Sequence, residues 1–395
     1  MKISSKISKV NPSLTLAISA KAKAMKKEGK DVVGFGAGEP DFDTPDHIKE
    51  AAIKSIKGGF TKYTPTSGTP ELKEAICKKL EKENNLKYSP SQIIISCGAK
   101  HSIFNIIQVI CDEGDEVIIP SPYWLSYPEM VTVAGGKSVF LETTLKNEYK
   151  FTLDQLKKAI TPKTVGLILN SPSNPTGSVY TPDEIKAIAE FLEDKDITVI
   201  SDEIYERLLY DGAEQYSIAQ YSEQMKSKTV VVNGVSKTYS MTGWRIGYAA
   251  APEEIVKAAS KLQDHSTSNP TSFCQVASQE AILGDQSSVE KMRQAFDERR
   301  KYMVEKVNSI PGLSCIRPKG AFYCFVCFKD LIGKTISGKK INGSMDITDY
   351  LLDTVQVAVV PGKAFGADDH FRLSYATSME NIKKGLDRIE KALKY

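Results

Sequence analysis

Short apolar runs alternate with amphipathic stretches over residues 90–250. The apolar runs that we interpret as strands cover residues 92–97, 115–119, 164–170, 197–202 and 229–233. They are rich in Ile, Val and Leu and are followed by turn-forming residues, which is typical of strands buried on both faces. Strands that alternate with helices predict an α/β fold with a doubly wound, mostly parallel sheet covered by helices on both faces.

Threonine–proline pairs mark the starts of several expected helices. These pairs occur at residues 44–45, 69–70 and 181–182, and Glu184 follows the third pair at the spacing of a capping box. Threonine is a favoured N-cap residue and proline is tolerated in the first helical turn. The helix after residue 70 is amphipathic, because its apolar residues recur on one face: Leu72, Ala75, Ile76 and Leu80.

The pattern changes after about residue 290, where a long charged helix precedes short strands and a final amphipathic helix. We therefore expect more than one domain, as the length of 395 residues also favours. Residues 1–45 are predicted to form an N-terminal arm and part of a small domain. Residues 46–290 should form the large sheet domain, and residues 291–395 the C-terminal small domain.

Composition excludes several classes of partner and ligand. The 52 Lys and Arg residues nearly balance the 49 Asp and Glu residues, so the net charge of +3 gives no nucleic-acid-binding footprint. The seven cysteines are scattered, which favours reduced thiols and a cytoplasmic location over a disulfide framework. Cys324 and Cys327 lie in an alternating strand and are interpreted as core residues. The four histidines are too dispersed to predict a metal site.

Residues 1–27 contain several lysines and no acidic residue, a composition that raises the question of a targeting sequence. The apolar stretch 14–18 is too short for a secretory signal and is flanked by Pro12 and Lys21, and the absence of arginine disfavours a transit peptide. We interpret this segment as mature protein. No apolar run approaches the length of a membrane span, so no membrane association is expected.

Residues 233–248 contain the strongest candidate for catalysis, Lys237, directly after a predicted strand. Ser236 precedes this lysine and Arg245 follows it, so one segment offers an amine, a hydroxyl and a guanidinium. That set suits a phosphate-bearing aldehyde, because the cation and hydroxyl bind phosphate while the amine condenses with the aldehyde. A P-loop would need glycine where the chain has Val231 and Ser236. The ordinary alternative is an exposed surface lysine.

A second candidate is Asp202, which ends the predicted strand preceding that of Lys237. A buried carboxylate is costly without a cationic partner, although an aspartate at a strand end is also a common helix cap. Gly34, Gly36 and Gly38 lie in an earlier loop, but their spacing, followed by Glu39, does not match a dinucleotide fingerprint. Ligands of doubly wound sheets bind beyond the carboxyl ends of the strands, where both candidates lie.

Residues 233–248 resemble the pyridoxal-phosphate lysine signature of class I aminotransferases, and Asn-Pro-Thr-Gly at 174–177 matches the same family. The similarity extends from about Lys9 to the C-terminus and is closest to the bacterial aspartate aminotransferases. It implies the fold of type I pyridoxal-phosphate-dependent transferases and a homodimer with shared active sites. It also implies ping-pong transfer of an amino group between L-aspartate or L-glutamate and 2-oxo acids, with pyridoxal 5′-phosphate on Lys237.

The resemblance also implies roles for individual residues. Asp202 would keep the pyridine nitrogen protonated, Tyr205 and Asn174 would contact the ring oxygen, and Trp124 would stack on the ring unless it is only a core residue. The full cofactor set is Lys237, Gly98, Ala99, Lys100, Trp124, Asn174, Asp202, Tyr205, Ser236, Arg245 and, from the neighbouring subunit, Tyr63. The substrate set is Gly38, Trp124, Asn174, Arg372, Lys100 and Thr15.

Substrate choice rests on fewer residues. Arg372, a lone arginine in an apolar strand, would clamp the α-carboxylate. Lys100 and Thr15 favour a second carboxylate, although Lys100 is equally consistent with a surface lysine. Aromatic, alanine or prephenate aminotransferases and lyases of the same fold remain alternatives; prephenate is disfavoured because related enzymes tend to carry lysine at the position of Asn11. A transcription regulator built on this fold would need an added DNA-binding domain, for which the sequence has no room.

Overall fold

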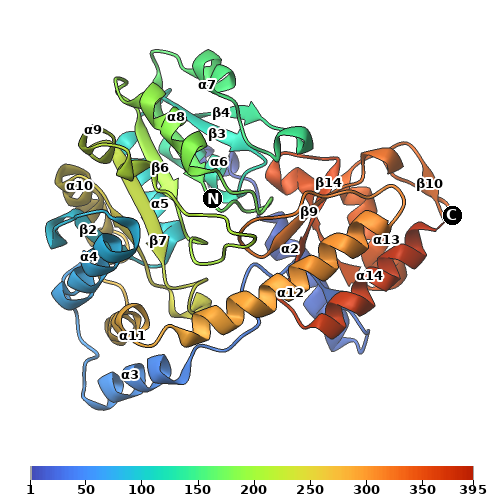
Figure 1. The fold of residues 1–395 in the computed structure, drawn as a ribbon, viewed down its shortest axis with the longest axis horizontal. Helices are drawn as coiled ribbons and strands as arrows, with labels where there is room; N and C mark the ends of the chain where they lie inside the picture. Colours follow the sequence, from blue (N-terminus) through green and yellow to red (C-terminus); the bar gives the residue numbers. More distant parts are fainter. Residues whose placement is uncertain (1, 395) are drawn as a thin grey trace.

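The computed structural model describes residues 2–394. Its main feature is a sheet of seven strands in the order β2-β8-β7-β6-β5-β3-β4 (Figure 1). The strands are β2 (Ile93–Ser96), β3 (Glu116–Ser121), β4 (Lys137–Glu142), β5 (Thr164–Asn170), β6 (Thr198–Asp202), β7 (Thr229–Gly234) and β8 (Gly247–Ala250). Only β8 runs antiparallel to its two neighbours, so the predicted mostly parallel α/β sheet is confirmed.

Successive residues of the strands face opposite layers of helices. Ile94, Ile168 and Ile200 pack on one face, against α5 (Ala99–Ile110), α6 (Ser126–Ala134) and α10 (Glu253–Asp264). Leu167 and Val199 face the other side. The helices of that side are α3 (Asp46–Lys57), α4 (Pro70–Asn84), α7 (Leu153–Ala159), α8 (Pro182–Leu192), α9 (Glu223–Lys226) and α11 (Ser272–Leu283). Burial on both faces explains why the strands read as continuous apolar runs.

Two of the three predicted helix starts are confirmed. The Thr181 hydroxyl accepts from the Glu184 N–H and the Glu184 carboxylate binds the Thr181 N–H, which completes the capping box of α8. Helix α4 begins at Pro70. The predicted cap at Thr44 is wrong, because α3 begins at Asp46 and the Thr44 hydroxyl donates to the carbonyl of Ser240 at 2.7 Å instead.

A smaller antiparallel sheet, in the order β13-β14-β9, lies beside the large one (Figure 1). Its strands are β9 (Tyr323–Cys327), β13 (Val360–Pro361) and β14 (His370–Ser374). Helices α12 (Ser287–Ser309), α13 (Ser344–Val355) and α14 (Met379–Leu393) pack with this sheet around one core cluster. A short hairpin joins β10 (Thr335–Ile336) to β11 (Lys339–Lys340).

The N-terminal residues pack against the C-terminal ones. Strand β1 (Val33–Gly34) pairs in parallel with β12 (Val357–Ala358). After the short α1 (Ser5–Ser8), helix α2 (Leu14–Lys27) buries Ile18, Ala22 and Met25 against Leu352 and Ala358. The apolar stretch in residues 14–18 is therefore part of a packed amphipathic helix. Within residues 2–394, no helix combines the length and hydropathy needed to cross a membrane.

Candidate active site

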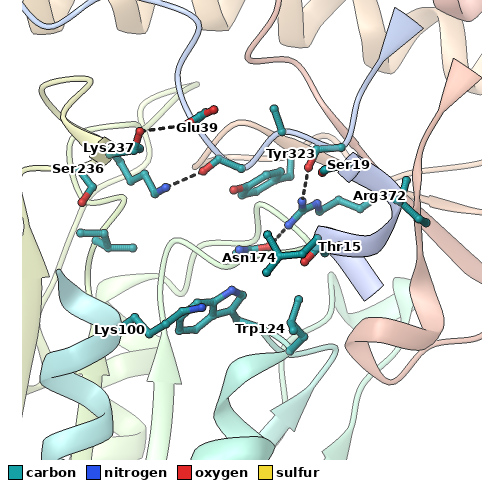
Figure 2. Close-up of a pocket in the computed structure, with 18 of the residues that line it drawn as sticks. Thr15, Ser19, Glu39, Lys100, Trp124, Asn174, Ser236, Lys237, Tyr323 and Arg372 are labelled. Carbon is teal, nitrogen blue, oxygen red and sulfur yellow. Dashed lines mark hydrogen bonds between the residues drawn. The ribbon is translucent and has the colours of Figure 1, made fainter. Parts of the chain in front are cut away.

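A cavity of about 630 Å³ lies beyond the carboxyl ends of β5, β6 and β7, between the large and small sheets (Figure 2). This is where the topology of a doubly wound sheet places a ligand. The predicted residues that line it are Thr15, Gly38, Ala99, Lys100, Trp124, Asn174, Asp202, Tyr205, Ser236, Lys237, Arg245 and Arg372. Of the other two, Gly98 borders the cavity through its contact with Arg245, whereas Tyr63 is 92% exposed and lies outside it.

Lys237 follows β7 and extends its amine into the cavity (Figure 2). Its Nζ donates a hydrogen bond to the carbonyl of Gly38 at 2.6 Å. Burial disfavours the ammonium form and lowers the pKa of Lys237 to about 8; Arg245 and Arg372 act in the same direction, against the attraction of Glu39 and Asp202. About one tenth of this lysine is thus an uncharged nucleophile at pH 7, far more than for a lysine with the ordinary pKa.

Asp202 ends β6 and is buried at the floor of the cavity. Its carboxylate accepts hydrogen bonds from the Tyr127 hydroxyl at 2.6 Å and from the Ile204 N–H at 3.3 Å. Burial raises the pKa of Asp202 to about 6, although these two donors and Lys237 oppose the shift. Among residues 2–394 no ion pair to Asp202 is found, so this buried carboxylate can accept a cationic ligand group.

One end of the cavity offers donors for an anion. Gly98 precedes α5 with a φ of +88°, and a Cβ there would lie 2.4 Å from Nη2 of Arg245. The Arg245 guanidinium donates to the carbonyls of Thr242 at 2.9 Å and Cys97 at 3.1 Å, which fixes it against the start of α5. The Ser236 hydroxyl lines the same cavity. A fixed guanidinium, a hydroxyl and a helix N-terminus together fit a phosphate group.

Trp124 and Lys100 form one wall of the cavity (Figure 2). Nζ of Lys100 lies 4.9 Å from the centre of the Trp124 ring, a cation–π contact. Trp124 also meets Tyr127 edge-on, with ring centres 5.2 Å apart. Lys100 is exposed at the cavity mouth, but the surrounding protein lowers its pKa by desolvation. Both side chains therefore combine a packing contact with a surface open to a ligand.

Arg372 on β14 reaches the cavity from the small sheet. Its Nη1 donates to Oδ1 of Asn174 at 2.7 Å and its Nη2 to the carbonyl of Gly36 at 3.2 Å. The guanidinium lies 4.3 Å from the centre of the Tyr323 ring and 5.0 Å from that of Phe365. No acidic side chain pairs with it in the described part of the chain, and its buried Nε lacks a hydrogen-bond partner. This unsatisfied cation fits a carboxylate ligand.

Sequence reasoning missed two tyrosines of the site. Tyr127 binds Asp202, and the Tyr323 hydroxyl is 2.9 Å from that of Tyr205. Tyr323 was included in a run interpreted as core strand, and only the pairing of β9 with β14 shows that it faces the same side as Arg372. The interpretation of Cys327 as core was wrong, since it is only half-buried, whereas Cys324 is buried as predicted.

Thr15 and Gly38 complete the set of predicted residues. Thr15 lies on α2, where its hydroxyl is 2.9 Å from that of Ser13. Gly38 has no side chain between the Lys237 amine and the backbone, and a Cβ there would lie 3.3 Å from the Tyr323 hydroxyl. The backbone before Glu39 therefore approaches the cavity closely, as a glycine allows.

Comparison with known proteins finds aminotransferases by both sequence and structure. The family model described as aminotransferase class I and II matches residues 30–389. An aspartate aminotransferase of Geobacillus stearothermophilus is 49% identical over 99% of this chain and 98% of its own length. An aspartate/prephenate aminotransferase of Nitrosomonas europaea is 47% identical over both full lengths. The crystal structure of an aspartate aminotransferase from Rhizobium meliloti superposes with a TM-score of 0.96, at 44% identity, covering 100% of this chain and 99% of the other. The chain belongs to the class I and II aminotransferase family.

Proposed function

We propose that this aminotransferase binds pyridoxal 5′-phosphate at Lys237 and moves an amino group between L-aspartate or L-glutamate and 2-oxo acids. The single observation that carries the proposal is the convergence of three ionisable groups, two of them buried and one half-buried, on one cavity. These groups are the Lys237 amine, the Asp202 carboxylate, and the Arg372 guanidinium, which has no acidic partner among the described residues. Each is costly to bury alone and matches one part of a cofactor–substrate pair.

The donor set fits the cofactor group by group. Ser236, Arg245 and the start of α5 at Ala99 suit the phosphate, while Asp202 suits a protonated ring nitrogen. Trp124 offers an aromatic face to the ring, and Tyr205 and Asn174 offer donors to its oxygen. In Asn174 the side-chain oxygen already accepts from Arg372, so its NH₂ group is left to donate.

The chain's own residues then account for substrate binding and proton transfer. When bound, the cofactor supplies an electron sink that acidifies the hydrogen on the substrate's α-carbon. Arg372 binds the α-carboxylate and so orients that carbon toward Lys237. Nζ of Lys237 takes the α-proton and returns it at a different carbon, a task suited to an amine whose pKa lies near 8. The oxo acid leaves before the second substrate enters, which gives ping-pong kinetics.

The preference for a dicarboxylic substrate is supported by Lys100 and Thr15 and by the names of the relatives. Lys100 offers a cation at the cavity mouth for the second carboxylate. Prephenate is the second candidate, because the Nitrosomonas europaea relative is named for both substrates. Asn11 has an uncharged amide and so adds no cation for a second carboxylate; its side chain and its N–H both donate to Glu129, at 3.0 Å and 2.9 Å.

A homodimer with shared sites, a cytoplasmic location and a two-domain division belong to the same proposal. The exposed Tyr63 would reach the cofactor phosphate of the neighbouring subunit. The seven free thiols favour a reducing compartment. Residues 46–290 would form the large cofactor-binding domain and residues 291–395 the small domain, with residues 1–45 as an arm that adds to the small domain.

The visible spectrum of the protein loaded with pyridoxal phosphate tests cofactor and substrate together. We expect L-aspartate alone to reduce the yellow absorbance and 2-oxoglutarate to restore it. Lys237→Ala should lower turnover by at least about 1,000-fold, because both the covalent anchor and the general base are removed. Colour that does not respond to aspartate would redirect the substrate search to aromatic amino acids, alanine or prephenate. Release of pyruvate and ammonia without an acceptor would indicate a lyase.

A further inference from the structure

A second group of reactive side chains lies at one end of the small sheet, outside the cavity that holds Lys237. Cys327 ends β9, His370 begins β14, and the two residues are directly paired in the antiparallel ladder. Sγ of Cys327, a ring nitrogen of His370 and a carboxylate oxygen of Asp369 all lie within 4.8 Å of one another. A cysteine sulfur this close to an imidazole that is paired with a carboxylate is the arrangement that activates a sulfur nucleophile.

The His370 ring is held in a fixed orientation. Its Nδ1 is 2.6 Å from Oδ1 of Asp369, and its Nε2 is 2.9 Å from the Tyr149 hydroxyl. One face of the ring stacks on Phe325, with centres 4.7 Å apart and planes 8° from parallel. An imidazole anchored through both nitrogens keeps a fixed position beside the neighbouring sulfur.

Electrostatics favour the charged pair of groups. Burial opposes the imidazolium, but Asp369 and Cys327 outweigh it and raise the pKa of His370 to about 9. Burial also opposes the thiolate, but His370 and the Lys329 N–H outweigh both burial and the Asp369 carboxylate, so the pKa of Cys327 is lowered. The titratable groups nearest this pair are Asp369 before β14, Lys329 in the turn after β9, and Tyr149 in the turn after β4. The thiols of Cys315 and Cys324 also act on Tyr149.

Other cysteines of the chain provide a contrast. Burial raises the pKa of Cys77, and raises that of Cys111 and Cys274 to about 11. Cys324 also has its pKa raised, by Cys315 and by burial. Cys327 is half-buried rather than enclosed, so a small reagent has access to it. Reactive cysteines combine partial exposure with a cationic neighbour, whereas buried cysteines are inert.

The same three residues could be considered as ligands of a divalent metal ion, since sulfur, imidazole and carboxylate are ligands of zinc. Both nitrogens of His370 already have hydrogen-bond partners, and Oδ1 of Asp369 is one of them. Metal binding would have to break at least one of these contacts and would require a neutral ring. The observed contacts therefore favour a thiolate–imidazolium pair.

We propose that Cys327 is a reactive thiolate and a site of covalent modification, taking soft electrophiles and hydroperoxides as reagents. With a hydroperoxide, the thiolate attacks the terminal oxygen, a sulfur–oxygen bond forms and the oxygen–oxygen bond breaks. The sulfur is oxidised by two electrons to a sulfenic acid. The leaving oxygen takes a proton from solvent and departs as an alcohol, or as water when the reagent is hydrogen peroxide.

The test is a brief pulse of limiting iodoacetamide on the full-length protein loaded with cofactor, with the labelling of each cysteine measured by mass spectrometry. Cys77, which is also half-buried and has a raised pKa, serves as the internal reference. At pH 7 we expect Cys327 to react at least about tenfold faster than Cys77, because a larger share of Cys327 is thiolate. The rate of Cys327 should also fall less than that of Cys77 between pH 8.5 and pH 6.5.

A variant separates the role of His370 from simple exposure. His370→Gln keeps hydrogen bonding to Asp369 and Tyr149 but removes the positive charge, so it should slow Cys327 about tenfold and leave Cys77 unchanged. Unchanged labelling of Cys77 also shows that the variant is folded. If the labelling of Cys77 changes, the comparison of Cys327 with Cys77 in the wild-type protein decides. Hydrogen peroxide followed by dimedone should label Cys327 first.

The proposal is overturned if wild-type Cys327 reacts no faster than Cys77. Labelling that appears only after treatment with a chelator would overturn it as well, because the cluster would then hold a metal ion. None of these readouts depends on transamination, so failure here would leave the proposed function standing.

Discussion

Arg372 and Asn174, which come from β14 and from the turn after β5, are joined by a hydrogen bond of 2.7 Å across the cavity. The bond links the residue assigned to the substrate carboxylate with the residue assigned to the cofactor ring. Because Asn174 donates nothing to Arg372, its NH₂ group is fixed toward the ring side of the site. The guanidinium in turn keeps its unpartnered Nε for a ligand.

Replacing Arg372 with lysine keeps the positive charge but should still weaken substrate binding. Lysine offers neither the bidentate fork nor the flat face that lies over Tyr323. We expect kcat/KM for the amino acid to fall by about 10- to 100-fold, since one to two charge-assisted hydrogen bonds are lost. Steady-state kinetics measure this, with the exposed Arg317→Lys as a control. Equal kinetics for both variants would contradict the clamp.

Asp202→Asn should stabilise the protein when no cofactor is bound. The folded-state pKa of Asp202 is about 6, above the ordinary 3.8. Between about pH 4 and pH 6 the folded state binds a proton at Asp202 that the unfolded state has lost. The free energy of unfolding therefore falls as the pH rises through this range, and it stays lowered by the full amount above about pH 6. The shift corresponds to at most about 3 kcal/mol. Asparagine can still accept from Tyr127 and avoids that cost.

Urea unfolding of the cofactor-free protein at pH 5 and pH 7.5 measures this difference. The advantage of Asp202→Asn over wild type should be larger at pH 7.5. Asp211→Asn is the opposite control, because hydrogen bonding to Arg300 lowers the pKa of Asp211. That variant should be less stable than wild type by the same amount at pH 5 and pH 7.5, because the contribution of Asp211 is lost only below its ordinary pKa of 3.8. A destabilised Asp202→Asn at pH 7.5 would show that the carboxylate is already compensated.

Lys237 and Asp202 could be predicted from sequence because the carboxyl ends of neighbouring parallel strands meet at one edge of the sheet. Strand periodicity places each residue at or just beyond a strand end, and the roles of both rest on the resemblance to the family. Tyr127 and Tyr323 could not be found in this way. The first reaches Asp202 from α6, and the second faces the cavity only through the register of β9 on β14. Their roles depend on how distant segments pack, which local patterns do not encode.

Two local rules failed where tertiary contacts competed with them. Thr44 precedes a proline and was predicted to cap a helix, but its hydroxyl donates to Ser240 across the fold and accepts from the Trp244 ring N–H. Cys327 lies in an apolar alternating strand, yet it is half-buried at the end of that strand, where it pairs with His370. Short polar side chains at the edges of elements have several possible partners, and only the assembled structure selects one.

Lys100→Ala should change which amino acid the enzyme prefers. If Lys100 binds the second carboxylate, kcat/KM with L-aspartate should fall by about 10- to 100-fold, the value of one charge-assisted contact, while that with L-alanine should stay within about threefold. Lys261→Ala, on the exposed side of α10, controls for the loss of a surface charge. A parallel fall for both substrates would instead assign Lys100 to cofactor binding or to packing on Trp124.

Tyr63→Phe tests whether two subunits share each site. Tyr63 is 92% exposed in the single chain and lies outside the cavity of that chain. We therefore expect it to contact the cofactor bound in the cavity of a neighbouring chain. Loss of one hydrogen bond to a phosphate should weaken cofactor binding by about tenfold. Tyr302→Phe, on the half-buried surface of α12, is the matched control.

Mixed dimers then decide whether the contact is made within a chain or between chains. A dimer of one Lys237→Ala chain and one Tyr63→Phe chain contains one site with an intact Lys237 and a partner that supplies an intact Tyr63. Its single active site should bind the cofactor with wild-type affinity. A dimer of a wild-type chain and a Lys237→Ala/Tyr63→Phe chain has the same composition, but the partner of its only active site lacks the tyrosine hydroxyl, so that site should bind about tenfold more weakly. If the two affinities are reversed, Tyr63 serves its own chain, and if they are equal it does not contact the cofactor.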